Sequence, residues 1–258
     1  MSKTYEALQR AEEARMPPPN FVNAPGAAQN DAPGANGAHA KGNGTKNGAH
    51  ATRLEYETIR VWLKNPVAHG QRLRTVMVIA CHSGTGSTTT AGLLATTLAR
   101  GRKSRVLVMD TNFRTPGVNL FFRVREDGEV PIPEDIPLEG TLHATDHENL
   151  FVLTSDHFTA SPIDAFEGEV FEDLFEEMKK RFDFIVLDAP PALDFPDAYA
   201  LAPKVDGIIL VAEAETTLIE DAQRAKRDLE RAGGRVLGVV MNRQADFLPS
   251  FIRRFVAR

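Results

Sequence analysis

Cysteine is almost missing from this sequence of 258 residues, and its rarity excludes the small folds that depend on several disulfides. Cys81 is the only cysteine, so no disulfide can form within the chain, which is consistent with a reducing cytoplasm. It lies where an apolar run meets a glycine-rich turn. A redox role and a plain small residue at a strand end both remain open for it.

Long apolar runs are also missing. No stretch approaches the roughly 20 residues of a membrane-spanning helix, and the first residues do not resemble a signal peptide. We therefore expect a cytoplasmic protein that would need a partner to hold it at the inner face of a membrane. The net charge of −5 gives no basic footprint for nucleic acid, and the seven histidines show no metal-site spacing.

The composition changes twice along the chain and predicts three parts. Residues 1–16 are rich in helix formers and predict a short helix, which would dock on its own domain or on a partner. Residues 17–52 are mostly Pro, Gly, Asn and Ala, and predict a disordered linker because they cannot bury enough apolar surface. Residues 53–258 carry the periodic apolar pattern of a folded domain.

Short aliphatic runs alternate with amphipathic stretches throughout the third part. This alternation predicts an α/β fold, a doubly wound and mainly parallel sheet with helices on both faces. We expect strands over 76–80, 105–110, 150–153, 184–188, 207–212 and 235–241. Helices are expected from Leu54 to Pro66 and over 87–100, 163–180 and 218–232, with 123–148 irregular. In the helix over 163–180, an apolar stripe at i, i+4 spacing is expected to face the core: Phe166, Val170, Leu174 and Met178.

The most informative stretch follows the first of these strands. Gly84 and Gly86 permit a tight turn, and the helix that follows opens at Ser87. A strand, a glycine-rich turn and a helix N-terminus together make a cradle of amide groups that suits phosphate. A P-loop would carry lysine after Gly86, and this chain has Ser87 instead. An ordinary strand–turn–helix corner that binds nothing is the alternative interpretation.

Two aspartates support a binding site. Asp110 and Asp188 each end an apolar run that predicts a buried strand. Ligands of doubly wound sheets bind beyond the carboxyl ends of the strands, so both carboxylates are expected at the same edge as the glycine-rich loop.

Together these segments resemble the bacterial tyrosine autokinases of capsular and exopolysaccharide biosynthesis, relatives of the cell-division and plasmid-partitioning ATPases. The resemblance rests on VLVMDTNFRTP (106–116), FDFIVLDAPP (182–191), VDGIILVAEAETT and RVLGVVMNR, in that order. It covers residues 54–243 and extends to the opening residues SKTYEALQRAEEAR. It implies binding of ATP with Mg²⁺.

The resemblance also implies roles for individual residues. The phosphates would be held by the loop and the start of the helix: Gly84, Thr85, Gly86, Ser87, Thr88 and Thr89. Thr88, Asp110 and Asp188 would serve Mg²⁺. In an active enzyme Asp110, as candidate base, Asp188 and Arg114 would be the catalytic residues.

Several departures from the family pattern fall on chemistry. Ser87 replaces the phosphate lysine, and Asn112 replaces the second aspartate of the strand motif. The assembly motif Glu-x-x-Arg-x-x-Arg corresponds to Glu57, Arg60 and Leu63, although Leu63 is equally consistent with a core position. The family's C-terminal tyrosine cluster has no counterpart, since the three tyrosines are Tyr5, Tyr56 and Tyr199.

Three functions are consistent with these features. The first is a catalytically impaired autokinase-like regulator of polysaccharide assembly or export that contacts a membrane copolymerase, chain-length regulator or export protein, with self-association possible. The second is an active kinase or ATPase of the same family, and the third is a positioning ATPase of the partitioning type. The tail FLPSFIRRFVAR (247–258) would contact an anionic membrane or a partner, or dock on its own domain.

Overall fold

A computed structural model describes residues 55–65, 70, 72–100, 104–124, 142–155 and 162–243. Its centre is a seven-stranded sheet in the order β3-β4-β2-β5-β1-β6-β7. All neighbouring strands are parallel except β3 and β4, which pair antiparallel. The predicted doubly wound, mainly parallel sheet is therefore confirmed.

Six of the seven strands, all except β3, agree with the predicted apolar runs to within one or two residues. The seven strands are β1 (Thr75–Ala80), β2 (Val106–Asp110), β3 (Leu142–Ala144), β4 (Leu150–Leu153), β5 (Phe184–Asp188), β6 (Gly207–Glu213) and β7 (Val236–Asn242). The labelled helices are α4 (Ser87–Ala99), α5 (Val118–Phe122), α6 (Pro162–Glu167), α7 (Glu169–Arg181), α8 (Asp197–Leu201), the 3-10 helix η1 (Ala202–Lys204) and α9 (Ile219–Arg231). A further helix covers residues 55–63.

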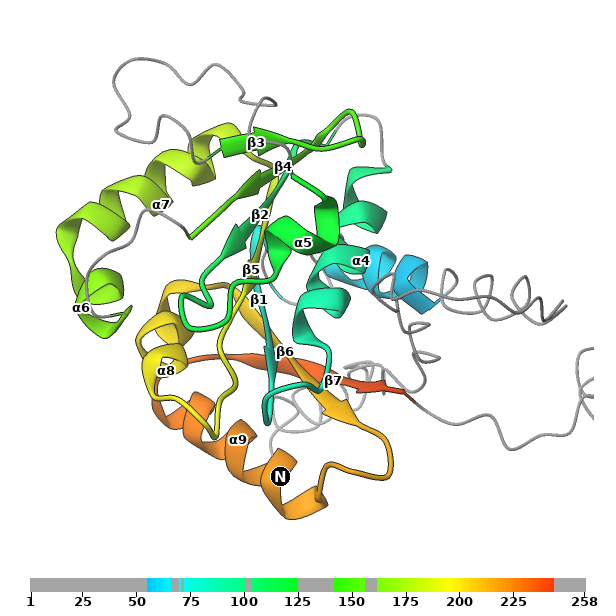
Figure 1. Cartoon of the computed structure of the whole chain (residues 1–258), viewed down its shortest axis with the longest axis vertical. Helices are drawn as coiled ribbons and strands as arrows, with labels where there is room; N and C mark the ends of the chain where they lie inside the picture. Colours follow the sequence, from blue (N-terminus) through cyan, green and yellow to red (C-terminus); the bar gives the residue numbers. More distant parts are fainter. Residues whose placement is uncertain are drawn as a thin grey trace, which may run out of the picture.

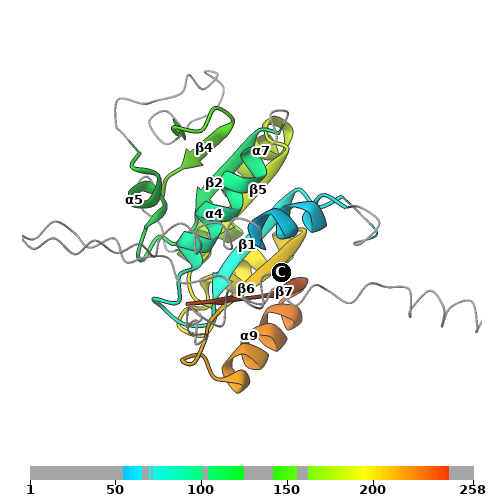
Figure 2. The same cartoon turned by 90° about the vertical axis from the view of Figure 1, so that its right-hand side faces the viewer.

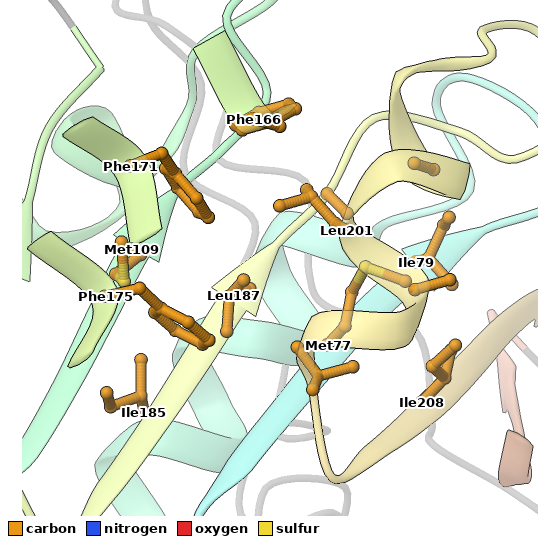
Figure 3. Close-up of a cluster of buried hydrophobic side chains, with 14 of the residues drawn as sticks. Met77, Ile79, Met109, Phe166, Phe171, Phe175, Ile185, Leu187, Leu201 and Ile208 are labelled. Carbon is orange, nitrogen blue, oxygen red and sulfur yellow. The ribbon is translucent and has the colours of Figure 1, made fainter. Parts of the chain in front are cut away.

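Helices cover both faces of the sheet (Figure 1). One face packs against α6 to α9, with aromatic side chains from α6 and α7 over the aliphatic side chains of the strands (Figure 3). The other face is covered by α4, α5 and the helix at 55–63, the last of which lies beside α4 in the turned view (Figure 2). Because every residue of β1, β2 and β5 is buried, these strands form the centre of the fold.

The single helix expected over 163–180 was wrong. The chain breaks at Gly168, whose extended backbone (φ −75°, ψ 148°) separates α6 from α7. The break changes the phase of the helix, so Phe171 and Phe175 face the core with Leu174 and Met178. Val170, which we expected in the apolar stripe, is 75% exposed.

The irregular segment expected over 123–148 contains one strand. β3 has only three residues, and it pairs with the edge of β4 in an otherwise polar stretch. Such a short strand offers too little alternation for a pattern to detect. The short helices α5 and α8 were missed for the same reason.

Leu63 is buried at 1% exposure and packs with Tyr56 and Ile59 against the face that α4 covers. It is therefore a core residue. The predicted N-terminal helix (1–16), the linker (17–52) and the tail (247–258) lie outside the described residues. Within those residues, no helix combines the length and apolarity needed to cross a membrane.

Candidate nucleotide-binding site

The glycine-rich loop connects β1 to α4 at the carboxyl edge of the sheet (Figure 1). Gly84 and Gly86 adopt φ of +80° and +93°, the left-handed region that favours glycine. The Thr85 hydroxyl donates a hydrogen bond to the carbonyl of His82 at 2.5 Å, which closes the turn. Gly86 is the N-cap residue of α4 and has no side chain to occupy the helix N-terminus. The first amides of α4 therefore point into a site that suits phosphate.

Asp188 lies across this loop, at the end of β5. Its Oδ2 accepts a hydrogen bond of 2.6 Å from the Thr88 hydroxyl on the first turn of α4. The residue is fully buried, and among the described residues its Oδ1 atom has no hydrogen-bond partner. Burial raises the pKa of the Asp188 carboxyl to about 7, the hydroxyls of Thr88 and Ser87 oppose the rise, and the charge of Asp110 adds to it.

A buried carboxylate oxygen without a partner beside a threonine hydroxyl fits a divalent cation, because Mg²⁺ prefers hard oxygen ligands. Thr88 and Asp188 would hold the ion, directly or through water. When bound, Mg²⁺ would neutralise phosphate charge at this end of the loop. The structure thus brings together two of the three residues predicted to serve Mg²⁺, Thr88 and Asp188, and the hydroxyl of Ser87 lies close to Asp188.

Asp110 is adjacent to Asp188 in the sheet, since the two residues are direct partners in the β2–β5 register. Its carboxylate is largely occupied by backbone amides. Oδ1 accepts from the amide of Asn112 at 3.1 Å, and Oδ2 accepts from the amides of Gly117 and Val118 at 3.0 and 3.1 Å. Asp110 therefore orders the start of α5 as well as lying near the cation position.

Arg114 is directed toward Asp197 at the start of α8. Its Nε and Nη2 atoms donate to the two carboxylate oxygens of Asp197 at 2.7 and 3.2 Å. The guanidinium also lies over the ring of Phe195, 4.6 Å from its centroid. Asp197 is buried, whereas the Arg114 side chain is 40% exposed. In this state Arg114 fastens the loop after β2 to α8.

Asn242, at the end of β7, was not predicted as a site residue. Its Nδ2 donates to the carbonyl of Thr85 at 2.8 Å and would lie 2.2 Å from a Cβ atom at Gly86. A side chain at position 86 is therefore excluded by close contact as well as by backbone conformation. The placement rule that found Asp110 and Asp188 also applies to Asn242, because β7 ends at the same edge.

The remaining predicted phosphate-binding residues lie where the sequence placed them. Thr89 is half-buried on the first turn of α4, and Gly84 is exposed at the tip of the loop. The stretch from Cys81 to Ala99 contains no lysine or arginine. Phosphate bound here would thus meet amides and hydroxyls from the loop and from α4, without a lysine or arginine from either.

The strand, the glycine-rich loop, the hydroxyl of Thr88 and the carboxylate of Asp188 define a P-loop NTPase-like protein. Residues 73–231 match the family described as the AAA domain. The chain is 32% identical over 177 residues to the tyrosine-protein kinase CpsD of Streptococcus pneumoniae, covering 67% of this chain and 78% of that protein. This chain belongs to the bacterial tyrosine autokinase family.

Solved structures agree with this assignment. The kinase domain of VpsO is 26% identical, with a TM-score of 0.63 over 78% of this chain and 100% of that domain. The septum site-determining protein MinD of Pyrococcus horikoshii, solved with Mg-ADP, is 25% identical, with a TM-score of 0.54 over 71% of this chain and 76% of that chain. At least one protein that shares this fold therefore binds a nucleotide with Mg²⁺.

Proposed function

We propose that this protein binds ATP or ADP with Mg²⁺ at the glycine-rich loop and is catalytically impaired as a kinase. The observation that carries the proposal is the unpartnered Oδ1 atom of Asp188, which lies buried beside Thr88 and the loop. A protein that had lost nucleotide altogether would gain stability by replacing this carboxylate, because an unpaired buried charge is costly. A bound Mg²⁺ ion would give this oxygen a partner and compensate for the charge of the carboxylate.

The impairment follows from charge. In P-loop proteins a lysine contacts the terminal phosphates, and position 87 carries a serine here. Ser87 is nine-tenths buried and its hydroxyl lies near Asp188. Among the described arginines, Arg114 is engaged by Asp197, and Arg243 pairs with Glu213 at 3.0 Å. The charge that develops during phosphoryl transfer would therefore be stabilised less well than in a P-loop with lysine.

Titration calorimetry with ADP and Mg²⁺ tests the binding step. The wild-type protein and Thr96→Ala should bind, and Thr88→Ala and Asp188→Asn should bind more weakly or not at all. Thr96 is the matched control because it lies about two turns further along the same helix and is similarly half-exposed. No heat of binding from the wild-type protein, with and without Mg²⁺, would contradict the proposal.

Family membership supports a proposal about the biological role. We propose regulation of exopolysaccharide or capsule synthesis or export through a membrane partner, either a copolymerase, a chain-length regulator or an export protein. The proposed recruiting element is residues 2–15, which the 36-residue segment 17–52 connects to the domain. A flexible chain of that length spans roughly 30–36 Å, which would let residues 2–15 reach a neighbouring protein. Deleting residues 1–52 should abolish membrane-fraction association without changing the melting temperature. A lower melting temperature with localisation intact would mean that the segment belongs to the fold.

A further inference from the structure

Both ring nitrogens of His82, in the glycine-rich loop, face carboxylate oxygens. Nδ1 lies 2.8 Å from Oδ1 of Asp194, in the segment after β5, and Nε2 lies 3.4 Å from Oδ2 of Asp221, on the first turn of α9. The three side chains are 47%, 27% and 31% exposed. One imidazole therefore connects the loop to two parts of the chain that lie 112 and 139 residues away in sequence.

The geometry determines the protonation state. Both carboxylates are in contact with solvent, and Asp221 lies at a helix N-terminus, where negative charge is favoured. An ionised carboxylate can only accept hydrogen bonds, whereas a neutral imidazole has one donor and one acceptor nitrogen. Two accepting partners are satisfied only when both nitrogens carry protons. This arrangement therefore favours the imidazolium form of His82.

The other groups around His82 agree with this assignment. Hydrogen bonding to Asp194 raises the pKa of His82 above its ordinary value, desolvation opposes the rise, and Asp221 adds to it. The neighbouring Cys81 thiol contributes no charge, because burial raises its pKa to about 11. Among the described residues, Asp194 and Asp221 are the charged groups that face the ring.

The two contacts of the ring are not equivalent. Asp194 also accepts from the amide and hydroxyl of Ser83, at 2.8 and 2.7 Å, and the adjacent backbone bonds to the loop through the amide of Leu193 and the carbonyl of Cys81 at 3.1 Å. The contact between the loop and Asp194 therefore persists when His82 is neutral, provided that the ring keeps its Nδ1 proton. The contact with Asp221 is lost when His82 is neutral, because a deprotonated Nε2 would place a lone pair against a carboxylate oxygen.

We propose that His82 is a positioning residue whose imidazolium form locks α9 to the phosphate loop, and that the lock opens when Nε2 loses its proton. The histidine gains its partners in the folded state, so the contact is complete at low pH and is lost as pH rises through the pKa of His82 in the folded protein. The net charge of the three side chains then changes from −1 to −2 beside the loop. Phosphate binding should weaken by about two- to fivefold, the size of one unit charge acting at short range in water.

Nitrogen-detected NMR of the full-length protein tests the lock without any ligand. At about pH 6 both ring nitrogens of His82 should carry protons, and at high pH only Nδ1 should. Asp221→Asn should lower the pKa of His82 by about 0.3 to 1 unit, a two- to tenfold loss of proton affinity. Asp228→Asn is the matched control, because it removes the same charge from α9 at a residue that pairs with Arg224 and Arg231 instead.

A ring that carries one proton at about pH 6 would overturn the proposal. Equal effects of the two α9 variants would overturn it as well.

The consequence for phosphate binding rests on the proposed function and is tested separately, as the ratio of ADP affinities of the wild-type protein and His82→Gln. Asp188 titrates in both proteins, so its effect on ADP affinity cancels from that ratio. The ratio should fall as pH rises. A constant ratio would contradict the effect on binding, whereas no binding by either protein would contradict the proposed function and leave the NMR test of the lock intact.

Discussion

Arg114 and Asp197 form a two-point ion pair that joins the loop after β2 to the start of α8, with donor–acceptor distances of 2.7 and 3.2 Å. Asp197 is buried, so removal of Arg114 would leave a buried carboxylate without its ion-pair partner. We expect Arg114→Ala to lower the melting temperature, and Arg114→Lys to restore it only in part because lysine cannot form both bonds. Asp197→Asn combined with Arg114→Ala should be less destabilised than the sum of the single variants, as a double-mutant cycle in thermal unfolding would measure. Additive effects would show that the pair contributes nothing.

Gly86 and Gly84 offer a matched pair of substitutions in the loop. Both have positive φ, but a Cβ atom at Gly86 would lie 2.2 Å from Nδ2 of Asn242, whereas a Cβ atom at Gly84 meets nothing within 4 Å. Gly84→Ala should cost only the backbone strain, about 1–2 kcal/mol. Gly86→Ala should cost more and should also weaken ADP binding, because it displaces Asn242 from the Thr85 carbonyl. Urea unfolding and ADP titration of both variants would check this, and equal losses would refute the role given to Asn242.

Leu63 belongs to the core, although its position matches an arginine of the family's assembly motif. Replacing a fully buried leucine with alanine removes packing contacts and leaves a cavity, so Leu63→Ala should lower the free energy of unfolding by about 2–5 kcal/mol. Val61, on the same helix, is 64% exposed, and Val61→Ala should change stability by less than about 0.5 kcal/mol. Chemical denaturation would measure both. A small effect at Leu63 would mean that the helix at 55–63 is not packed as described.

Asp188 should make stability depend on pH. Its pKa is near 7 in the folded protein and lower when unfolded, so the folded state holds the extra proton and stability falls as pH rises between about 4 and 7. Asp188→Asn removes this dependence while keeping an acceptor for Thr88. In the absence of Mg²⁺ the variant should therefore be more stable than the wild-type protein at pH 8, by about 2–4 kcal/mol at most, and the difference should shrink at pH 5. A difference that does not change with pH would contradict the burial of an unpaired carboxylate.

The sequence predicted the centre of the fold well because β1, β2, β5 and β6 are continuous aliphatic runs, and buried parallel strands need such runs. It failed where structure depends on a single residue. Gly168 interrupts an apolar period that continues on both sides, and only the backbone shows that the period restarts at a new phase. β3 is held by pairing with β4 rather than by its own pattern.

In the site, the sequence located Thr88 and Asp188 because each lies in a motif with a defined place on a strand or helix. The partners Asp194, Asp197 and Asn242 were not found. They contact the loop or Arg114 across 83 to 157 residues of sequence, and a lone aspartate or asparagine after a strand carries no signal of what it will touch. Tertiary contact, rather than local pattern, gives these residues their roles.

The proposed impairment of catalysis depends most on the missing charge at position 87, so the most direct measurement is steady-state ATP hydrolysis by the wild-type protein and Ser87→Lys with saturating Mg²⁺. We predict that the wild-type protein binds nucleotide but turns over far more slowly than the roughly 1–100 s⁻¹ usual for kinases. Ser87→Lys should bind nucleotide more tightly, because it restores a positive charge directed at the phosphates. Turnover by the wild-type protein within that ordinary range, with no gain in affinity from Ser87→Lys, would contradict the account.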